Sequence, residues 1–430
     1  TLEVDDAKKP TRYRFGDGWK ALETTTAKFR VKLWGPFSLP VTRPVYRSVH
    51  GPVFLTPSGV VAVAYGGQSD VRAAEQWRRM NKARSFEDWK SAMAIQGIPS
   101  FNVVYADRTG TIAYYYNAAL PVRAAGVDWT KPQSGADPQL VWTGVRPFGS
   151  APFVERPASG YVANANNTPF EATDPADAPK AENYPPEFGI DRRQSNRGFR
   201  EHELYGADPS ITAEEFVGYK MDDAYSTRSK IVGIVDALVA DARLAADPAT
   251  KDAIAVLKAW DRTARQDSRG AALALRIGCH IYNCYDADEP GDIVDPEAAL
   301  RQSVKELTAL HGRVDPPWSE AMRLKRGAAD LPIDGGPDTL RAVYPSFESK
   351  PEKWIAGGGD TYILYADWAK DGAVAIRTIH QFGSATLDAR SPHYADQAPV
   401  FAAEQWKTPP LTLEAALAEK TRDYRPGKTP

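Results

Sequence analysis

The chain has 430 residues, with 53 Lys and Arg against 55 Asp and Glu, six His and two Cys, and 43% of its residues are hydrophobic. The net charge of -2 excludes the basic excess of a nucleic-acid binder, and the aromatic content excludes a disordered chain. No apolar run reaches the roughly eighteen residues of a membrane span, so we expect neither a nucleic-acid nor a membrane partner. The first residues, TLEVDDAKKP, have no Met and no signal-peptide pattern, which is typical of a mature fragment or a processed subunit.

The first third of the chain predicts strands. Residues 16–18 (Gly-Asp-Gly) predict a hairpin turn. Residues 101–117 predict two strands joined at 107–110, because apolar residues recur at period two on both sides of that turn. Between these hairpins, Ser85 and Asp88 have the spacing of a capping box, which predicts the start of a short helix.

The rest of the chain has an aperiodic segment, which is followed by a segment with helical periodicity. Pro, Asn, Asp and Gly dominate the segment after the second hairpin, and a long aperiodic segment in a compact protein indicates functional loops. A helical period follows, beginning with a second capping box at Thr212 and Glu215. We therefore predict an α+β fold in one domain over 1–430, strand-rich at 1–120 and 355–400, with a loop region at 118–200 and a helical subdomain at about 205–345.

The two cysteines, Cys279 and Cys284, are too few for a disulfide-built scaffold. Their position beside His280 is compatible with a metal or redox pair. A zinc site needs four ligands, however, and the sequence offers no second cysteine pair and no histidine pair at ligand spacing. We therefore expect two small residues buried in a helix.

The segment GYVANANNTPF (160–170) has the densest group of chemically useful side chains. Three Asn within four residues, between Gly160 and Pro169, do not suit the interior of a strand or helix. One interpretation is an Asn-rich turn capped by its own side chains. The other is that one carboxamide N–H stabilises an oxyanion, a contribution worth about 3–4 kcal/mol in acyl transfer.

Five segments follow one another in a characteristic order over nearly the whole chain. They are VYRSVHGPVF (45–54), IPSFNVVYADRTGTIAYYYNA (98–118), GYVANANNTP (160–169), AWDR with a following DS (259–268) and SPHYADQ (391–397). Together they make the sequence similar to the penicillin acylase family of N-terminal nucleophile (Ntn) hydrolases, and it resembles the acyl-homoserine lactone, cephalosporin and cyclic-lipopeptide acylases more than the penicillin G enzymes. The resemblance implies an αββα sandwich with a helical subdomain and hydrolysis of amides by the first residue of a self-cleaved β chain, usually Ser, whose α-amine acts as the base.

The resemblance assigns candidate catalytic residues by position. Asn164 matches the Asn of the oxyanion hole, and Arg197 matches an Arg that holds this Asn and the nucleophile region in place. Asp360 falls where some cephalosporin acylases have a Glu that orients a His. Each has an alternative: Arg197 as a surface ion-pair partner of Glu201 or Glu203 with Arg200 as the operative residue, and Asp360 as a cap at the start of a strand.

The resemblance also places Phe101, next to Ser100, at the acyl pocket, and Trp142 adds to the apolar side chains suited to such a pocket. Phe101 could equally belong to the ordinary core. Family members need no cofactor in many cases. Some bind calcium structurally, and no calcium ligands can be matched in this sequence, so we expect no cofactor and no metal site.

The chain departs from the family pattern at its start. The residues resembling TLEVDDAKKP follow the nucleophile by roughly eighty residues in the family, so we expect the nucleophile upstream of Thr1, with an N-terminal α chain and the β-chain N-terminal segment as partners. Thr1 itself is an alternative nucleophile, but no catalytic loop follows it. A third possibility is a non-catalytic binding protein. The resemblance implies an N-acylated small-molecule substrate and a periplasmic or secreted protein.

Overall fold

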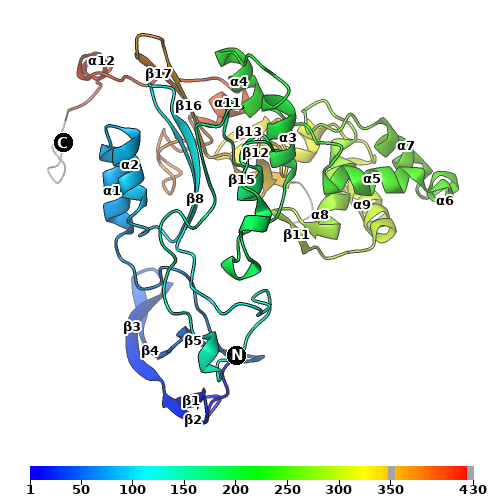
Figure 1. Cartoon of the computed structure of the whole chain (residues 1–430). Helices are drawn as coiled ribbons and strands as arrows, with labels where there is room; N and C mark the ends of the chain where they lie inside the picture. Colours follow the sequence, from blue (N-terminus) through cyan, green and yellow to red (C-terminus); the bar gives the residue numbers. More distant parts are fainter. Residues whose placement is uncertain (347–353, 424–430) are drawn as a thin grey trace. The chain divides into compact units, whose positions relative to one another are not determined.

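The computed structural model describes residues 1–346 and 354–423, and the chain divides into two compact units, Thr1–Arg193 and Gln194–Pro430 (Figure 1). We call these the first and the second unit and describe each by itself. Both contain helices and sheets, so the secondary structure is of the predicted α+β type. None of the helices in the described ranges is long and apolar enough to cross a membrane.

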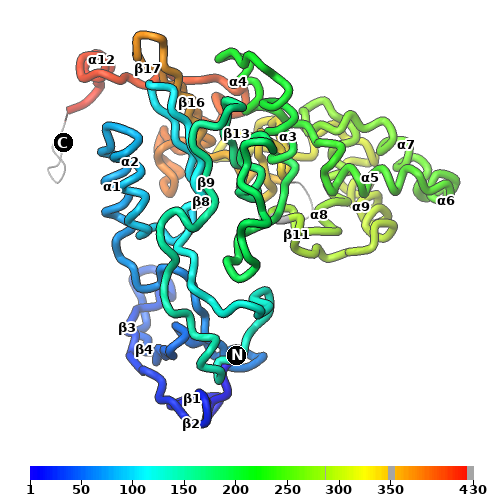
Figure 2. Tube along the Cα trace, viewed as in Figure 1, coloured from blue at the N-terminus to red at the C-terminus, as the bar shows by residue number. Residues whose placement is uncertain are grey.

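The first unit contains three antiparallel sheets, two α-helices and four single-turn 3-10 helices. Its sheets have the strand orders β1-β2, β3-β4-β5-β6 and β7-β8-β9. From the end of β8 to the end of the first unit, the chain has little regular structure apart from β9 and short 3-10 turns, as Figure 2 shows. The elements are β1 (Arg12–Phe15), β2 (Gly18–Ala21), β3 (Glu23–Trp34), β4 (Phe37–Ser48), β5 (Gly51–Thr56), β6 (Gly59–Ala62), α1 (Ala73–Lys82), α2 (Phe86–Met93), β7 (Ser100–Ala106), β8 (Ile112–Ala118) and β9 (Phe153–Glu155).

The predicted hairpin over 101–117 is confirmed as β7 and β8. β8 is the central strand of its sheet, and both of its faces are covered. Tyr114 is buried in a small cluster with Val154, whereas Tyr115 packs on the opposite face against Trp89 of α2, with ring centroids 5.5 Å apart. Adjacent buried tyrosines of this kind replace the simple alternation of a half-exposed sheet.

The helix predicted at Ser85 is confirmed as α2. The Ser85 hydroxyl accepts a hydrogen bond from the backbone N–H of Asp88 at 3.1 Å. The reciprocal bond differs from an ideal capping box, because the Asp88 carboxylate accepts from the backbone N–H of Arg84 at 3.2 Å. Phe86 and Trp89 are both buried on one face of this helix.

The second unit contains helices packed with a mixed four-stranded sheet of order β13-β12-β15-β14, and β16 pairs with β17 in a separate hairpin. The capping box at Thr212 and Glu215 is confirmed at the start of α4. The elements are α3 (Asn196–Tyr205), α4 (Ala213–Lys220), α5 (Lys230–Ala240), α6 (Ala242–Ala246), α7 (Lys251–Ala259), α8 (Ala271–Ile281), β10 (Tyr282–Asn283), β11 (Asp286–Pro290), α9 (Pro296–His311), α10 (Trp318–Ala321), β12 (Met322–Arg326), β13 (Ala329–Pro332), β14 (Val343–Pro345), β15 (Trp354–Gly359), β16 (Tyr362–Trp368), β17 (Val374–His380), α11 (Ala398–Ala402) and α12 (Leu413–Ala418).

The core of the second unit is built around α8. Every residue from 271 to 278 is buried, so this helix is covered on all sides. Leu273 and Ile277 are fully buried, and the small side chains of Ala271, Ala272 and Ala274 on the same helix allow neighbouring helices to approach closely. The core extends to the sheet through Trp318, whose ring contacts that of Trp354 on β15 edge-on, with centroids 5.9 Å apart.

The prediction for the two cysteines is wrong: Cys279 and Cys284 form a disulfide. Cys279 lies in the last turn of α8, and both residues are half-buried. The helix ends at Ile281, and the chain reverses in the β10–β11 hairpin, where the Asn283 side chain accepts from the backbone N–H of Tyr285 at 2.9 Å. This reversal returns the second cysteine to the first.

Candidate active site

The segment 160–170 forms a turn that is closed by its own asparagines. The Asn164 carboxamide donates to the Asn167 carbonyl at 3.0 Å and accepts from the Asn166 backbone N–H, also at 3.0 Å. Asn166 has a φ of 66°, a left-handed conformation that Asn tolerates better than most residues. The interpretation as an Asn-rich turn is therefore confirmed.

This turn is anchored in the first unit by buried side chains. Asn167 is 2% exposed, and its carboxamide accepts from the Ala165 N–H at 2.8 Å and donates to the Glu171 carbonyl at 3.1 Å. The Thr168 hydroxyl donates to the Asp191 carbonyl at 2.8 Å. Because each of these groups is fixed, the backbone that holds Asn164 is preorganised.

The turn uses one of the two N–H groups of the Asn164 carboxamide. Asn164 is half-buried, and no described residue accepts from the second N–H. A fixed amide donor with a vacant hydrogen is the group that an oxyanion requires. The oxyanion role of Asn164 stays a prediction, and it is compatible with the side chain's role in the turn.

A cavity of about 590 Å³ lies in the first unit, and Trp142 lines it. Gly66 forms part of the wall, and a Cβ at this position would come within 1.9 Å of the Ala119 carbonyl oxygen, so only glycine fits. The wall also includes Gln68, whose Oε1 is buried without a hydrogen-bond partner in the described chain.

The other two predicted pocket residues lie on β7 and do not belong to the described wall of this cavity. Phe101 is 54% exposed and contacts Trp77 edge-on, with ring centroids 6.0 Å apart. Ser100 is exposed. The exposure of Phe101 argues against the alternative that it is an ordinary core residue, and its substrate role stays a prediction.

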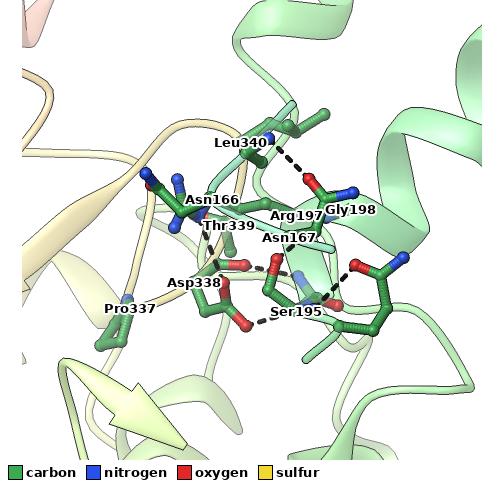
Figure 3. A network of polar contacts seen from close by, with 12 residues as sticks. Asn166, Asn167, Ser195, Arg197, Gly198, Pro337, Asp338, Thr339 and Leu340 are labelled. Atoms are coloured by element: carbon green, nitrogen blue, oxygen red, sulfur yellow. Dashed lines mark hydrogen bonds and ion pairs between the residues drawn. The ribbon is translucent and has the colours of Figure 1, made fainter. Parts of the chain in front are cut away.

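Arg197 lies in the first turn of α3 and pairs with a residue remote in sequence. Asp338 accepts from the Arg197 Nε at 3.2 Å and from the Asn196 backbone N–H at 2.7 Å, while Ser195 caps the helix by accepting from Gly198 (Figure 3). A carboxylate at this position also interacts favourably with the positive end of the helix. Arg197 is therefore held by Asp338 in the second unit.

The alternative residue, Arg200, belongs to a different network. It pairs with Asp222 at 2.7 Å and with Glu203 at 2.6 Å. These two carboxylates occupy its guanidinium, and they raise the pKa of Arg200. Arg197 and Arg200 thus have separate partners, although they lie about one turn apart on α3.

Asp360, between β15 and β16, pairs with two cations of the second unit rather than with a histidine. Lys220 is 2.7 Å from the Asp360 carboxylate, and Arg341, which is fully buried, is 3.7 Å away. Arg341 also pairs with Glu404 at 3.2 Å. Burial lowers the pKa of both Lys220 and Arg341, and the neighbouring carboxylates oppose this change. The His-orienting role of Asp360 stays a prediction.

Glu201 connects the surroundings of Arg197 and Asp360. It is buried on α3, where the charges of Arg197 and Lys220 act on it. Desolvation is the larger effect and raises the pKa of Glu201 to about 7 despite these cations. One charged cluster of the second unit therefore contains Arg197, Glu201, Lys220 and Asp360.

The sequence analysis did not identify three charged residues of this region, because no local motif marks them. They are Lys220, Asp338 and Arg341.

Glu201 makes stability depend on pH. Its pKa in the folded chain is about 7, against an ordinary value of 4.5. Because the folded state binds this proton more tightly, the contribution of Glu201 to the free energy of unfolding is complete below pH 4.5 and is lost as the pH rises through 7. We expect Glu201→Gln to remove this slope and to stabilise the chain at pH 8 by on the order of 2 kcal/mol.

Urea unfolding of both chains from pH 4 to pH 8 measures this effect. Burial and the neighbouring carboxylate of Asp334 also raise the pKa of Asp223 to about 7, so that residue titrates in the same range in both chains. The difference between wild type and Glu201→Gln isolates Glu201. Parallel pH profiles for the two chains would contradict the expectation.

No group of three or more His, Cys, Asp or Glu side chains within the described ranges is placed to hold a metal ion.

The curated proteins similar to this chain include two that are named as acylases. Penicillin G acylase of Escherichia coli is 31% identical over 168 residues, which cover 38% of this chain and 19% of that protein. Acyl-homoserine lactone acylase PvdQ of Pseudomonas fluorescens (strain Pf0-1) is 23% identical over 468 residues, which cover 96% of this chain and 59% of that protein. The chain thus spans less than two thirds of the length of these curated relatives.

Among solved structures, the thermostable penicillin G acylase from Alcaligenes faecalis matches 99% of this chain and 84% of its own chain, with a TM-score of 0.64 and 17% identity. This match shows the fold, which is the predicted Ntn-hydrolase fold. The family model described as penicillin amidase matches residues 1–418. Because this match covers nearly the whole chain, the chain belongs to the penicillin amidase family.

Proposed function

We propose that this chain is the larger part of the catalytic subunit of an acylase, which hydrolyses the amide bond of N-acylated small molecules. Its relatives are named as acylases of penicillin G and of acyl-homoserine lactones, which differ in both the acyl and the amine half. The structural observation that supports the proposal best is the anchored turn at Asn164, which leaves one carboxamide N–H without an acceptor in the described chain.

The proposed reaction has two steps. The hydroxyl of an N-terminal Ser on a companion polypeptide attacks the substrate carbonyl, and its α-amine takes the proton. Asn164 donates its second N–H to the oxyanion, the C–N bond breaks, and the amine product leaves with a proton. Water then attacks the acyl-enzyme ester and releases the carboxylic acid and the free Ser hydroxyl. These steps use no cofactor.

Other residues have supporting roles in this proposal. Arg197, held by Asp338, positions the nucleophile region, and Asp360 belongs to the same charged cluster. Trp142, Phe101 and Ser100 contact the acyl group. The substrate is a soluble N-acylated molecule, and no nucleic acid or membrane takes part.

We place the protein in the periplasm or outside the cell. The disulfide between Cys279 and Cys284 supports this location, because disulfides form and persist in oxidising compartments.

A specific contact bears on the alternative nucleophile, Thr1. Its ammonium group donates to the Gln133 carbonyl at 2.6 Å, and burial lowers the pKa of the amine. The lowered pKa favours the unprotonated amine, which can act as a base, whereas the hydrogen bond to a carbonyl favours the protonated form. The next residue, Leu2, pairs with Val60 in a β-bridge, so the contacts of Thr1 also have a structural explanation.

An inhibitor that acylates N-terminal nucleophiles distinguishes the candidate functions. The complete protein is treated with the inhibitor, and its chains are separated and analysed by mass spectrometry. We expect the label on the first residue of a companion chain. Label on Thr1 would show that this chain supplies its own nucleophile, and absence of label together with absence of amide hydrolysis would favour a non-catalytic binding protein.

A further inference from the structure

The hairpin of β3 and β4 has one apolar and one polar face. Side chains alternate along β3, so that Phe29 and Val31 point to one face and the basic residues Lys28, Arg30 and Lys32 to the other. The register extends the apolar face to β4, because Phe29 is opposite Val41 and Val31 is opposite Leu39. Such strict alternation is typical of a sheet that packs one face against other protein.

The apolar face is nevertheless exposed. Phe29 is 48% exposed, Val31 40%, Leu39 53%, Phe37 58% and Trp34 67%. A bulge after Lys32 brings Trp34 opposite Phe37, and their rings contact each other, with centroids 5.5 Å apart. These side chains are neighbours on one face, so they form a continuous patch rather than scattered surface residues. We call Phe29, Val31, Trp34, Phe37 and Leu39 the hairpin patch.

The nearby core of the first unit does not cover the patch. That core contains Tyr46 of β4 and Val53 of β5, which lie directly opposite each other. Tyr46 is an even-numbered residue of β4, so its side chain points to the face opposite that of Leu39 and Phe37. The sheet therefore has its own core on one face and the uncovered hairpin patch on the other.

We propose that the hairpin patch is the docking surface for the companion polypeptide that the proposed function invokes. The acyl-homoserine lactone acylase of Pseudomonas fluorescens matches 96% of this chain, yet the match covers 59% of that protein, so a large part of its polypeptide has no counterpart here. Polypeptide of that size can cover the patch. The inference rests on the proposed function for the identity of the occupant, whereas the position of the surface rests on the exposure of the hairpin.

Two substitutions on the same strand test the surface. Leu39→Glu puts a charge in the hairpin patch. Thr42→Glu is the matched control, because Thr42 is exposed on the other face of β4, opposite Lys28, where a new carboxylate forms a favourable cross-strand pair. Both chains should fold, and circular dichroism and thermal unfolding of each chain check this.

Association is measured with the companion polypeptide produced from the same precursor, by co-purification and by titration of the separated chains. We expect Leu39→Glu to weaken association at least tenfold and Thr42→Glu to change it less than twofold. Hydrogen exchange of residues 23–48 should slow when the companion is added to the wild-type chain.

Other occupants give different results, and each would overturn the proposal. Unchanged association of Leu39→Glu would place the companion elsewhere. A dimer of the isolated chain that Leu39→Glu dissociates would make the patch a self-association surface, and binding to anionic phospholipid vesicles lost in Leu39→Glu alone would make it a lipid-binding surface. A companion complex that depends on Leu39 but hydrolyses no amide would support the docking surface and contradict the proposed function.

Discussion

In the complete protein, Asn164→Ala is expected to lower the kcat of the proposed amide hydrolysis by about 10²–10³ with little change in KM. A preorganised oxyanion donor contributes mainly to the transition state, and removal of one such donor costs about this much. The turn should survive, because its backbone is also held by Asn167 and Thr168, which are 2% and 4% exposed. Steady-state kinetics and thermal unfolding of the same preparation measure the two effects separately.

Two variants in the same turn serve as controls. Asn164→Asp keeps an oxygen that accepts from the Asn166 N–H but removes both N–H donors, so it should lose activity, and thermal unfolding measures the effect of losing the bond to the Asn167 carbonyl. Asn167→Ala removes a buried side chain with two or more hydrogen bonds and should mainly lower stability. Wild-type kcat in a folded Asn164→Ala enzyme would show that another donor stabilises the oxyanion.

Local signals in the sequence were sufficient for much of the secondary structure. The capping residues Ser85 and Thr212 act through hydrogen bonds to residues three positions ahead, and both helices begin there. The turn at 107–110 joins two strands whose pattern is equally local. The order of family motifs then indicated the fold, which the solved acylase structure shares.

Long-range pairing was not visible in the sequence. Asp338 and Asn196 are 142 positions apart, and Lys220 and Asp360 are 140 positions apart. Pairs at such separations depend on how the chain folds back on itself. The composition of the sequence and its hydrophobic periodicity do not determine that path. The cysteine prediction failed for a related reason: it placed both cysteines in one helix, whereas α8 ends at Ile281 and a chain reversal brings Cys284 back to it.

Asp338→Ala is expected to lower the free energy of unfolding by about 2–4 kcal/mol. The carboxylate accepts from the Asn196 backbone N–H at 2.7 Å and from Arg197 at 3.2 Å, and its removal breaks both of these hydrogen bonds at the start of α3. Asp338 also has a φ of 60°, which strains an alanine at this position. Urea unfolding of the chain measures the loss.

Asp338→Gly and Asp338→Asn separate these causes. Glycine removes the carboxylate without backbone strain, so the difference between the glycine and alanine variants gives the cost of the left-handed conformation. Asparagine retains an uncharged acceptor and tolerates the same φ, so it should cost about 1 kcal/mol. Equal stability of all three variants and the wild type would contradict the role of Asp338 in holding Arg197 and the start of α3.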